Sequence, residues 1–192
     1  MSRAVNVPTY IADVIVAVMG LSPLIEGEEM PVQIDGFAGG DRTDIALPEP
    51  QEALLERLAA LGKPLVLVLL NGSALAVNWA AEHVPAIVEA WYPGQAGGEA
   101  LADVLFGDYN PGGRLPVTFY RSVDDLPPFE DYSMEGRTYR YFRGEPLYPF
   151  GHGLSYTTFE YGDLAVSRQQ AAAGEAVERT VRVTNTGPGA RG

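Results

Sequence analysis

Three runs of consecutive apolar residues constrain the fold of this chain most strongly. They span residues 13–19, 64–70 and 86–91, and none of them alternates apolar with polar residues. Strands of this kind belong to sheets that are covered on both faces, as parallel sheets are. We therefore expect three buried strands, the first of which has both of its faces covered.

Helical patterns separate these runs. Apolar residues recur at helical spacing over residues 50–61, where Gly62 marks the C-terminal stop, and shorter helices are expected over residues 74–82 and 97–106. An alternation of strands and helices indicates βα crossovers. The sequence thus predicts an α/β fold with a mostly parallel sheet flanked by helices, whose ligands would bind at the carboxyl ends of the strands.

The pattern changes in the second half of the chain. A short strand is expected over residues 115–119, and apolar and polar residues then alternate over residues 159–167 and 176–184. The last two segments resemble strands of a β-sandwich, which two strands cannot close. We expect a truncated β-sandwich segment whose exposed edges recruit another copy of the chain, forming a homo-oligomer.

Composition excludes several classes of function. The formal net charge is −12, and no cluster of Lys or Arg offsets it, so neither nucleic acid nor an anionic membrane is an expected partner. The chain has no cysteine and two histidines, which rules out cysteine-ligated metals and a three-histidine zinc site. The apolar run at residues 11–21 is too short to span a bilayer and is interpreted as a strand. Localisation is undecided, because disulfide-free proteins occur in several compartments.

Carboxylates cluster directly after the first strand. Glu26, Glu28 and Glu29 lie within four residues, at an edge of the sheet where ligands bind. Mutual repulsion raises the pKa of at least one such carboxyl, and a protonated carboxyl is what a general acid requires. The alternative is a solvated acidic loop, and the residues alone leave the two interpretations even.

Other polar and aromatic groups near the strand ends have simpler explanations. Residues 41–44 (DRTD) are interpreted as an Asp–Arg turn that braces the loop, in preference to a substrate contact. The Trp91-Tyr92 pair is a candidate platform for a sugar ring, although aromatic residues at strand ends more often cover the core. A flavodoxin-like nucleotide binder fits the βα pattern but lacks a phosphate loop.

Several long blocks occur in a characteristic order. These are GLSPLIEGEE, GGDRTDIALP, LVLVLLNGS, AWYPGQAGGEALADVLFGDYNPGGRLPVTF, DYSMEGRTYRYF and LYPFGHGLSYTTFEY. Together they resemble glycoside hydrolase family 3, in particular its β-xylosidase and β-glucosidase branch. The resemblance implies that residues 11–158 form the later part of the family's C-terminal α/β sandwich domain. Residues 159–192 would then begin an incomplete fibronectin type III-like domain.

The same resemblance implies a function. In the family, an N-terminal barrel carries the aspartate nucleophile, and the α/β sandwich domain supplies the general acid/base glutamate. Matching the family pattern assigns that role to Glu28, with Glu26 and Glu29 as alternatives, and it makes Ser22 and Trp91 weak candidates for substrate contacts. Nothing in this chain resembles the barrel.

We therefore expect part of a retaining exo-β-glycosidase that acts on terminal β-linked xylose or glucose. It would require no metal or other cofactor, and its partners would be a β-linked oligosaccharide or glycoside and the missing barrel. The alternative is a non-catalytic carbohydrate-binding or interaction module that keeps this fold without the chemistry.

Overall fold

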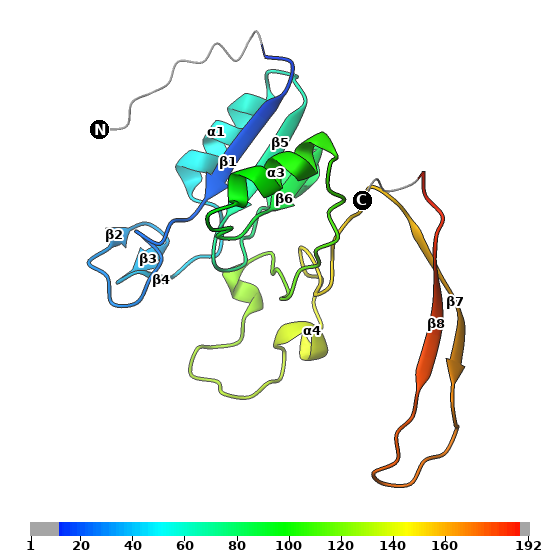
Figure 1. The fold of residues 1–192 in the computed structure, drawn as a ribbon. Coiled ribbons are helices and arrows are strands. Elements are labelled where there is room, and N and C mark those ends of the chain that lie inside the picture. Colours follow the sequence, from blue (N-terminus) through cyan, green and yellow to red (C-terminus); the bar gives the residue numbers. More distant parts are fainter. Residues whose placement is uncertain (1–11, 189–192) are drawn as a thin grey trace. The chain divides into compact units, whose positions relative to one another are not determined.

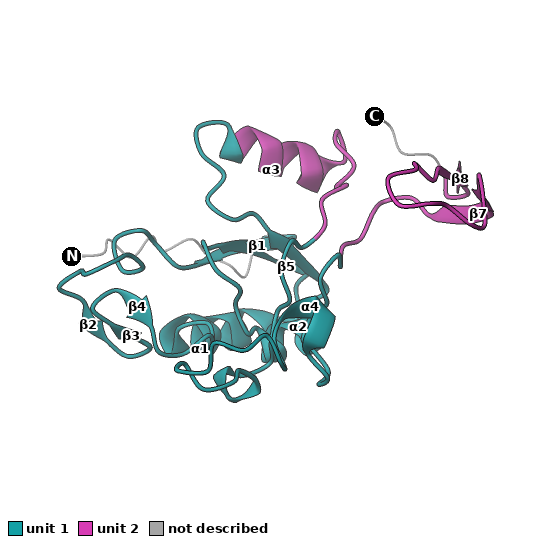
Figure 2. Ribbon diagram, turned by 90° about the horizontal axis from the view of Figure 1, so that it is seen from below, with its two compact units in different colours: residues 1–97, 115–152 teal, residues 98–114, 153–192 magenta. Residues whose placement is uncertain are grey.

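The computed structural model describes residues 12–188, so Ile11, the first residue of the expected domain, lies outside the described residues. The chain forms two compact units, which Figure 2 distinguishes by colour. The first unit comprises residues up to Gly97 together with Leu115–His152. The second comprises Gly98–Arg114 and the residues from Gly153 onward.

A parallel sheet forms the centre of the first unit (Figure 1). Its strands are β1 (Ile15–Gly20), β5 (Leu65–Leu70) and β6 (Ala86–Glu89), in the spatial order β1-β5-β6. Ile15 pairs with Leu65, and Val66 pairs with Ala86, both in parallel register. The expected α/β fold with a parallel sheet is therefore confirmed, and the three carboxyl ends lie at one edge.

Burial across this sheet is uneven. In the central strand β5, Leu65, Leu67, Val68 and Leu69 are all almost fully buried. In β1 the buried Ile15 and Ala17 alternate with Val16 and Val18, whose exposed fractions are 45% and 54%. The prediction that β1 is covered on both faces is wrong for the described residues. Only the face that carries Ile15 and Ala17 packs into the core, against α1 (Glu49–Ala59) and Leu55, and the face that carries Val16 and Val18 stays about half exposed.

The two shorter helices differ in how closely their bounds match those predicted from the sequence. The helix α3 (Gly97–Phe106) has the expected bounds, whereas α2 (Asn78–His83) begins four residues after the expected start at residue 74. Ala76 is held in an extended conformation, because its N–H donates to the Ile45 carbonyl at 2.8 Å and it forms a parallel bridge with Ala46. A backbone paired in this way cannot also begin a helix.

A long segment separates β1 from α1 and contains a small antiparallel sheet. Its strands are β2 (Gln33–Ile34), β3 (Phe37–Ala38) and β4 (Asp41–Arg42), in the order β2-β3-β4. The sequence predicted only a loop here, since strands of two residues are too short to produce a periodic pattern. The small sheet folds the segment back toward the carboxyl edge of the main sheet.

The strand expected over residues 115–119 is absent. Phe119 forms a single antiparallel bridge with Tyr148, and Leu115 exchanges backbone hydrogen bonds with residues 151 and 152. Pro116 explains the interruption, because proline has no N–H to donate to a ladder. The 3-10 helix η2 (Val123–Asp125) and the short helix α4 (Thr138–Tyr141) follow.

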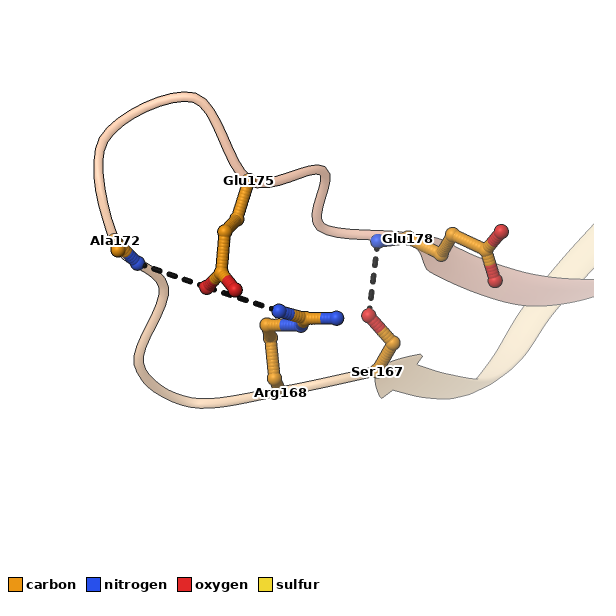
Figure 3. Close-up of polar contacts among 5 residues, drawn as sticks. All are labelled: Ser167, Arg168, Ala172, Glu175 and Glu178. Atoms are coloured by element: carbon orange, nitrogen blue, oxygen red, sulfur yellow. Dashed lines mark hydrogen bonds and ion pairs between the residues drawn. The ribbon is translucent and has the colours of Figure 1, made fainter.

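The second unit contains a two-stranded ribbon. The strands β7 (Phe159–Val166) and β8 (Arg179–Asn185) pair antiparallel, with an irregularity between Gly162 and Ala165, and every residue of both strands is exposed. At the tip, Arg168 pairs with Glu175 at 3.0 Å, and the Glu178 N–H donates to the Ser167 hydroxyl at 3.0 Å (Figure 3). Both expected strands are present, close to the expected bounds.

We predict that the amide protons of β7 and β8 exchange with solvent at least about tenfold faster than those of β5. The reason is that an isolated two-stranded ribbon is only marginally stable in water, whereas β5 is buried on both sides. Hydrogen exchange measured by NMR on a sample shown to be monomeric tests this. Equal protection of β5 and the ribbon in that sample would contradict the prediction.

Candidate functional site

Polar side chains gather where the three parallel strands end. Glu26 follows β1, Ser73 follows β5 and Tyr92 follows β6, all within the first unit. Because the strands are parallel, these ends lie at one edge of the sheet. The sequence predicted a site at this edge because it includes Glu26, and in the structure both Ser73 and Tyr92 contact Glu26.

The Glu26 carboxylate is bound by two hydroxyl groups. The Ser73 hydroxyl donates to Oε1, and the Tyr92 hydroxyl donates to Oε2 at 3.0 Å. Partial burial and the hydrogen bond to this carboxylate raise the pKa of Tyr92 to about 12. The Tyr92 phenol therefore remains a proton donor to Glu26 at neutral pH.

Arg42 extends this cluster from the small antiparallel sheet. Its Nη1 donates to the Ser73 hydroxyl at 3.1 Å and to the Ala74 carbonyl at 2.9 Å, and its Nη2 donates to the Ala46 carbonyl at 3.3 Å. Burial lowers the pKa of Arg42, and the nearby Glu26 carboxylate opposes that shift. The expected Asp–Arg turn is not found within the described residues. Arg42 lies in β4, forms no ion pair with Asp41 or Asp44, and instead joins the loop to the end of β5.

The other two glutamates of the acidic cluster are differently placed. Glu28 and Glu29 are both exposed, and neither carboxylate forms a hydrogen bond or an ion pair within the described part of the chain. Glu29 also has a positive φ of 49°, which is uncommon for a residue other than glycine. Over residues 12–188, the structure therefore distinguishes one hydrogen-bonded carboxylate from two that have no partner.

Comparison with known proteins identifies the fold. Residues 2–156 match the family described as the glycosyl hydrolase family 3 C-terminal domain. The chain belongs to glycoside hydrolase family 3. It is 57% identical over 168 residues to a xylan 1,4-β-xylosidase of Xylanibacter ruminicola, a match that covers 88% of this chain and 19% of that protein. It is 44% identical to a periplasmic β-glucosidase of Salmonella typhimurium, across 92% of this chain and 23% of that protein.

Solved structures of the family have the same fold. A β-glucosidase from Erythrobacter marinus is 42% identical, with a TM-score of 0.78, over 93% of this chain and 24% of that one. β-Glucosidase 3B from Thermotoga neapolitana, in complex with α-D-glucose, is 34% identical, with a TM-score of 0.75, over 93% of this chain and 26% of that one. The family 3 chain described here thus spans about a quarter or less of the length of these relatives.

Two further candidates lie beside the acidic cluster of this family 3 domain. The Ser22 carbonyl accepts hydrogen bonds from the N–H groups of Ile25 and Glu26, and its hydroxyl accepts from the N–H of Leu24, so Ser22 shapes the turn that presents Glu26. Trp91 is partly buried and packs edge-on against Phe119, with ring centroids 6.0 Å apart. In this position Trp91 covers part of the core, which is the alternative to a platform for a sugar ring.

Sequence reasoning missed a buried polar pair next to these residues. Asn71 is fully buried, and its Nδ2 donates to the Ser73 carbonyl at 2.8 Å and to Glu89 Oε2 at 3.3 Å. Glu89 Oε1 accepts from the Trp91 N–H at 3.1 Å. Burial raises the pKa of Glu89 to about 7 against the opposing effect of these hydrogen bonds. The available signal was a single glutamate within the apolar run at residues 86–91.

Neither a metal site nor a membrane segment is found in the part of the family 3 chain that the structure describes. Over residues 12–188, no three His, Cys, Asp or Glu side chains are grouped so as to hold a metal ion. Over the same residues, no helix has the length and apolar character needed to cross a bilayer.

Proposed function

We propose that this chain supplies the general acid/base carboxyl of a retaining exo-β-glycosidase that hydrolyses terminal β-linked xylose or glucose. Glu28 is the proposed acid/base residue. Membership of family 3 supports this class of activity, since relatives of the chain carry the names β-xylosidase and β-glucosidase.

The observation that carries the assignment is the contrast between Glu26 and Glu28. Both oxygens of Glu26 already accept hydrogen bonds from the domain's own hydroxyl groups. Glu28 lies two residues further along the same loop, is exposed, and has no partner within the described residues. A residue that exchanges a proton with a substrate must approach the substrate oxygen directly, and Glu28 is free to do so.

The proposed mechanism requires a second carboxyl. In retaining hydrolysis two carboxyl groups lie about 5 to 5.5 Å apart on either side of the glycosidic bond. The nucleophile, which the family places on its barrel, attacks the anomeric carbon and forms a glycosyl-enzyme. Glu28 protonates the departing oxygen and later removes a proton from the water that hydrolyses this intermediate. Glu28 alone cannot complete the cycle.

The test compares this chain with a protein in which the family's barrel precedes it. We expect the chain alone to release nitrophenol from aryl β-xylosides and β-glucosides at well below about 1 per second, an ordinary enzymatic rate. The joined protein should turn over at least one of these substrates with retention of configuration. Hydrolysis by the purified chain alone would contradict the proposal. Sugar binding without hydrolysis by the joined protein would also contradict it and would indicate a carbohydrate-binding module.

We also propose that residues 159–192 begin a fibronectin type III-like domain. The exposed apolar side chains of β7 support this, since Tyr161 and Leu164 are 70% and 73% exposed and a sandwich would bury one face of the ribbon. Association of two copies of the chain through these exposed strands stays a prediction that sedimentation analysis would test.

A further inference from the structure

We infer that Ser73, Tyr92 and Arg42 are positioning residues, which fix Glu26 as the anchor of the loop that presents Glu28. This inference rests on the proposed function for the role of Glu28. The anchor itself is a structural claim about this chain, so the two can fail separately.

Segments that follow three strands meet at Glu26. Ser73 follows β5 and Tyr92 follows β6, so the Glu26 carboxylate ties the segment after β1 to the ends of both neighbouring strands. The ends are closely packed, because a Cβ added to Gly72 would lie 2.9 Å from Tyr92 Cε2 and 3.5 Å from Glu26 Oε2. A glycine at this position leaves room for the tyrosine to reach the carboxylate.

The positive charge of Arg42 helps to hold the cluster together. Arg42 donates to the Ser73 hydroxyl, which in turn donates to Glu26, so the guanidinium acts on the carboxylate through a hydroxyl bridge. Hydrogen bonds that involve an ionised partner are roughly twice as strong as neutral ones. Arg42 also binds the carbonyls of Ala46 and Ala74, which lie on the two segments that the cluster joins.

Backbone contacts connect the Glu26 anchor to the turn that carries Glu28. The N–H of Gly27 donates to the Gly40 carbonyl at 3.2 Å, and the N–H of Met30 donates to the Gly39 carbonyl at 2.7 Å. A Cβ on Gly40 would lie 1.9 Å from the Gly27 carbonyl oxygen, so the two backbones touch. The turn that carries Glu28 is therefore held by backbone hydrogen bonds on both sides, and the Glu26 side chain, two residues before Glu28, fixes the start of this turn.

The test on the chain itself is hydrogen exchange at the Gly27 and Met30 amides. We expect Ser73→Ala and Tyr92→Phe each to speed exchange at these two amides by about 10- to 100-fold, the effect of losing one hydrogen bond to a charged group. Exchange in β5 should stay unchanged. The conservative variant Ser73→Thr keeps the hydroxyl and should restore slow exchange.

A matched control removes a phenol hydroxyl elsewhere in the same unit. Tyr132 is 93% exposed, so Tyr132→Phe should leave the two loop amides as they are in the parent chain. Unchanged exchange in both Ser73→Ala and Tyr92→Phe would overturn the inference. So would a failure of Ser73→Thr to restore protection, since the hydroxyl would then not be the group that matters.

A kinetic readout in the protein joined to its barrel separates positioning from chemistry. Tyr92→Phe and Ser73→Ala should lower kcat for substrates with poor leaving groups by about tenfold with little change in KM, and azide should not restore the rate, because Glu28 is still present. Azide rescue of these variants would overturn the inference. If Glu28 proves not to be the acid while the exchange result holds, the proposed function fails and the anchor stands.

Discussion

Replacing Glu28 by glutamine, in the protein joined to its barrel, is expected to slow the hydrolysis of substrates with poor leaving groups by about 10² to 10⁴-fold. This is the usual contribution of general acid catalysis, and glutamine has no proton to give. Substrates with good leaving groups need little protonation, so formation of their glycosyl-enzyme should be much less affected. Comparison of alkyl and nitrophenyl glycosides under single-turnover conditions provides the measurement.

Azide distinguishes the three glutamates of the acidic loop. It attacks the trapped glycosyl-enzyme without the help of a general base, so it should restore turnover of Glu28→Gln and yield the glycosyl azide. Glu29→Gln is the matched control, because Glu29 is the adjacent exposed carboxylate. Glu26→Gln should weaken the anchor without becoming azide-dependent. Rescue of Glu26→Gln or Glu29→Gln, and not of Glu28→Gln, would assign the acid/base role to the rescued position.

The main sheet could be predicted because each of its strands corresponds to a continuous run of apolar residues in the sequence. β5 is the clearest example, since the run at residues 64–70 becomes a central strand with nearly complete burial. The same pattern misled at β1, where Val16 and Val18 are apolar and yet about half exposed. An apolar residue in a strand indicates that its face of the sheet can be covered. Whether another element covers that face has to be seen in the structure.

The candidate site was predictable only in part. Glu26 and Glu28 were found because three carboxylates in four residues are a local signal. The proposed choice of Glu28 over Glu26 rests on the family pattern and on the contrast between their contacts. Arg42 and Ser73 are 31 residues apart in sequence, and Glu26 and Tyr92 are 66 apart, so no spacing rule connects them. They meet because parallel strands bring their carboxyl ends to one edge, which fixes the region of a site but not its contacts.

Stability should also depend on pH through Glu89. Its pKa is about 7 in the folded chain, compared with an ordinary value of 4.5, and the cause is burial at the end of β6. Between these two values the folded chain binds a proton that the unfolded chain releases. The free energy of unfolding therefore falls as pH rises from about 4.5 to 7, which is the opposite of the usual behaviour of a salt-bridged carboxylate.

The expected size follows from the shift. Each pKa unit is worth about 1.4 kcal/mol, and discounting for the accessible part of the side chain gives a loss of about 1 to 3 kcal/mol across this range. The variant Glu89→Gln carries no titrating group there, so its stability should fall less and should exceed that of the parent chain above pH 7. Urea unfolding at pH 5, 6, 7 and 8 measures both effects, with each free energy of unfolding extrapolated linearly to zero denaturant.

An exposed carboxylate near the same strand supplies the control for this experiment. Glu82, at the end of α2, is exposed, so Glu82→Gln should reproduce the pH dependence of the parent chain. If Glu89→Gln loses as much stability as the parent between pH 5 and 8, Glu89 is ionised throughout. The Asn71 and Trp91 hydrogen bonds would then outweigh the burial that raises its pKa.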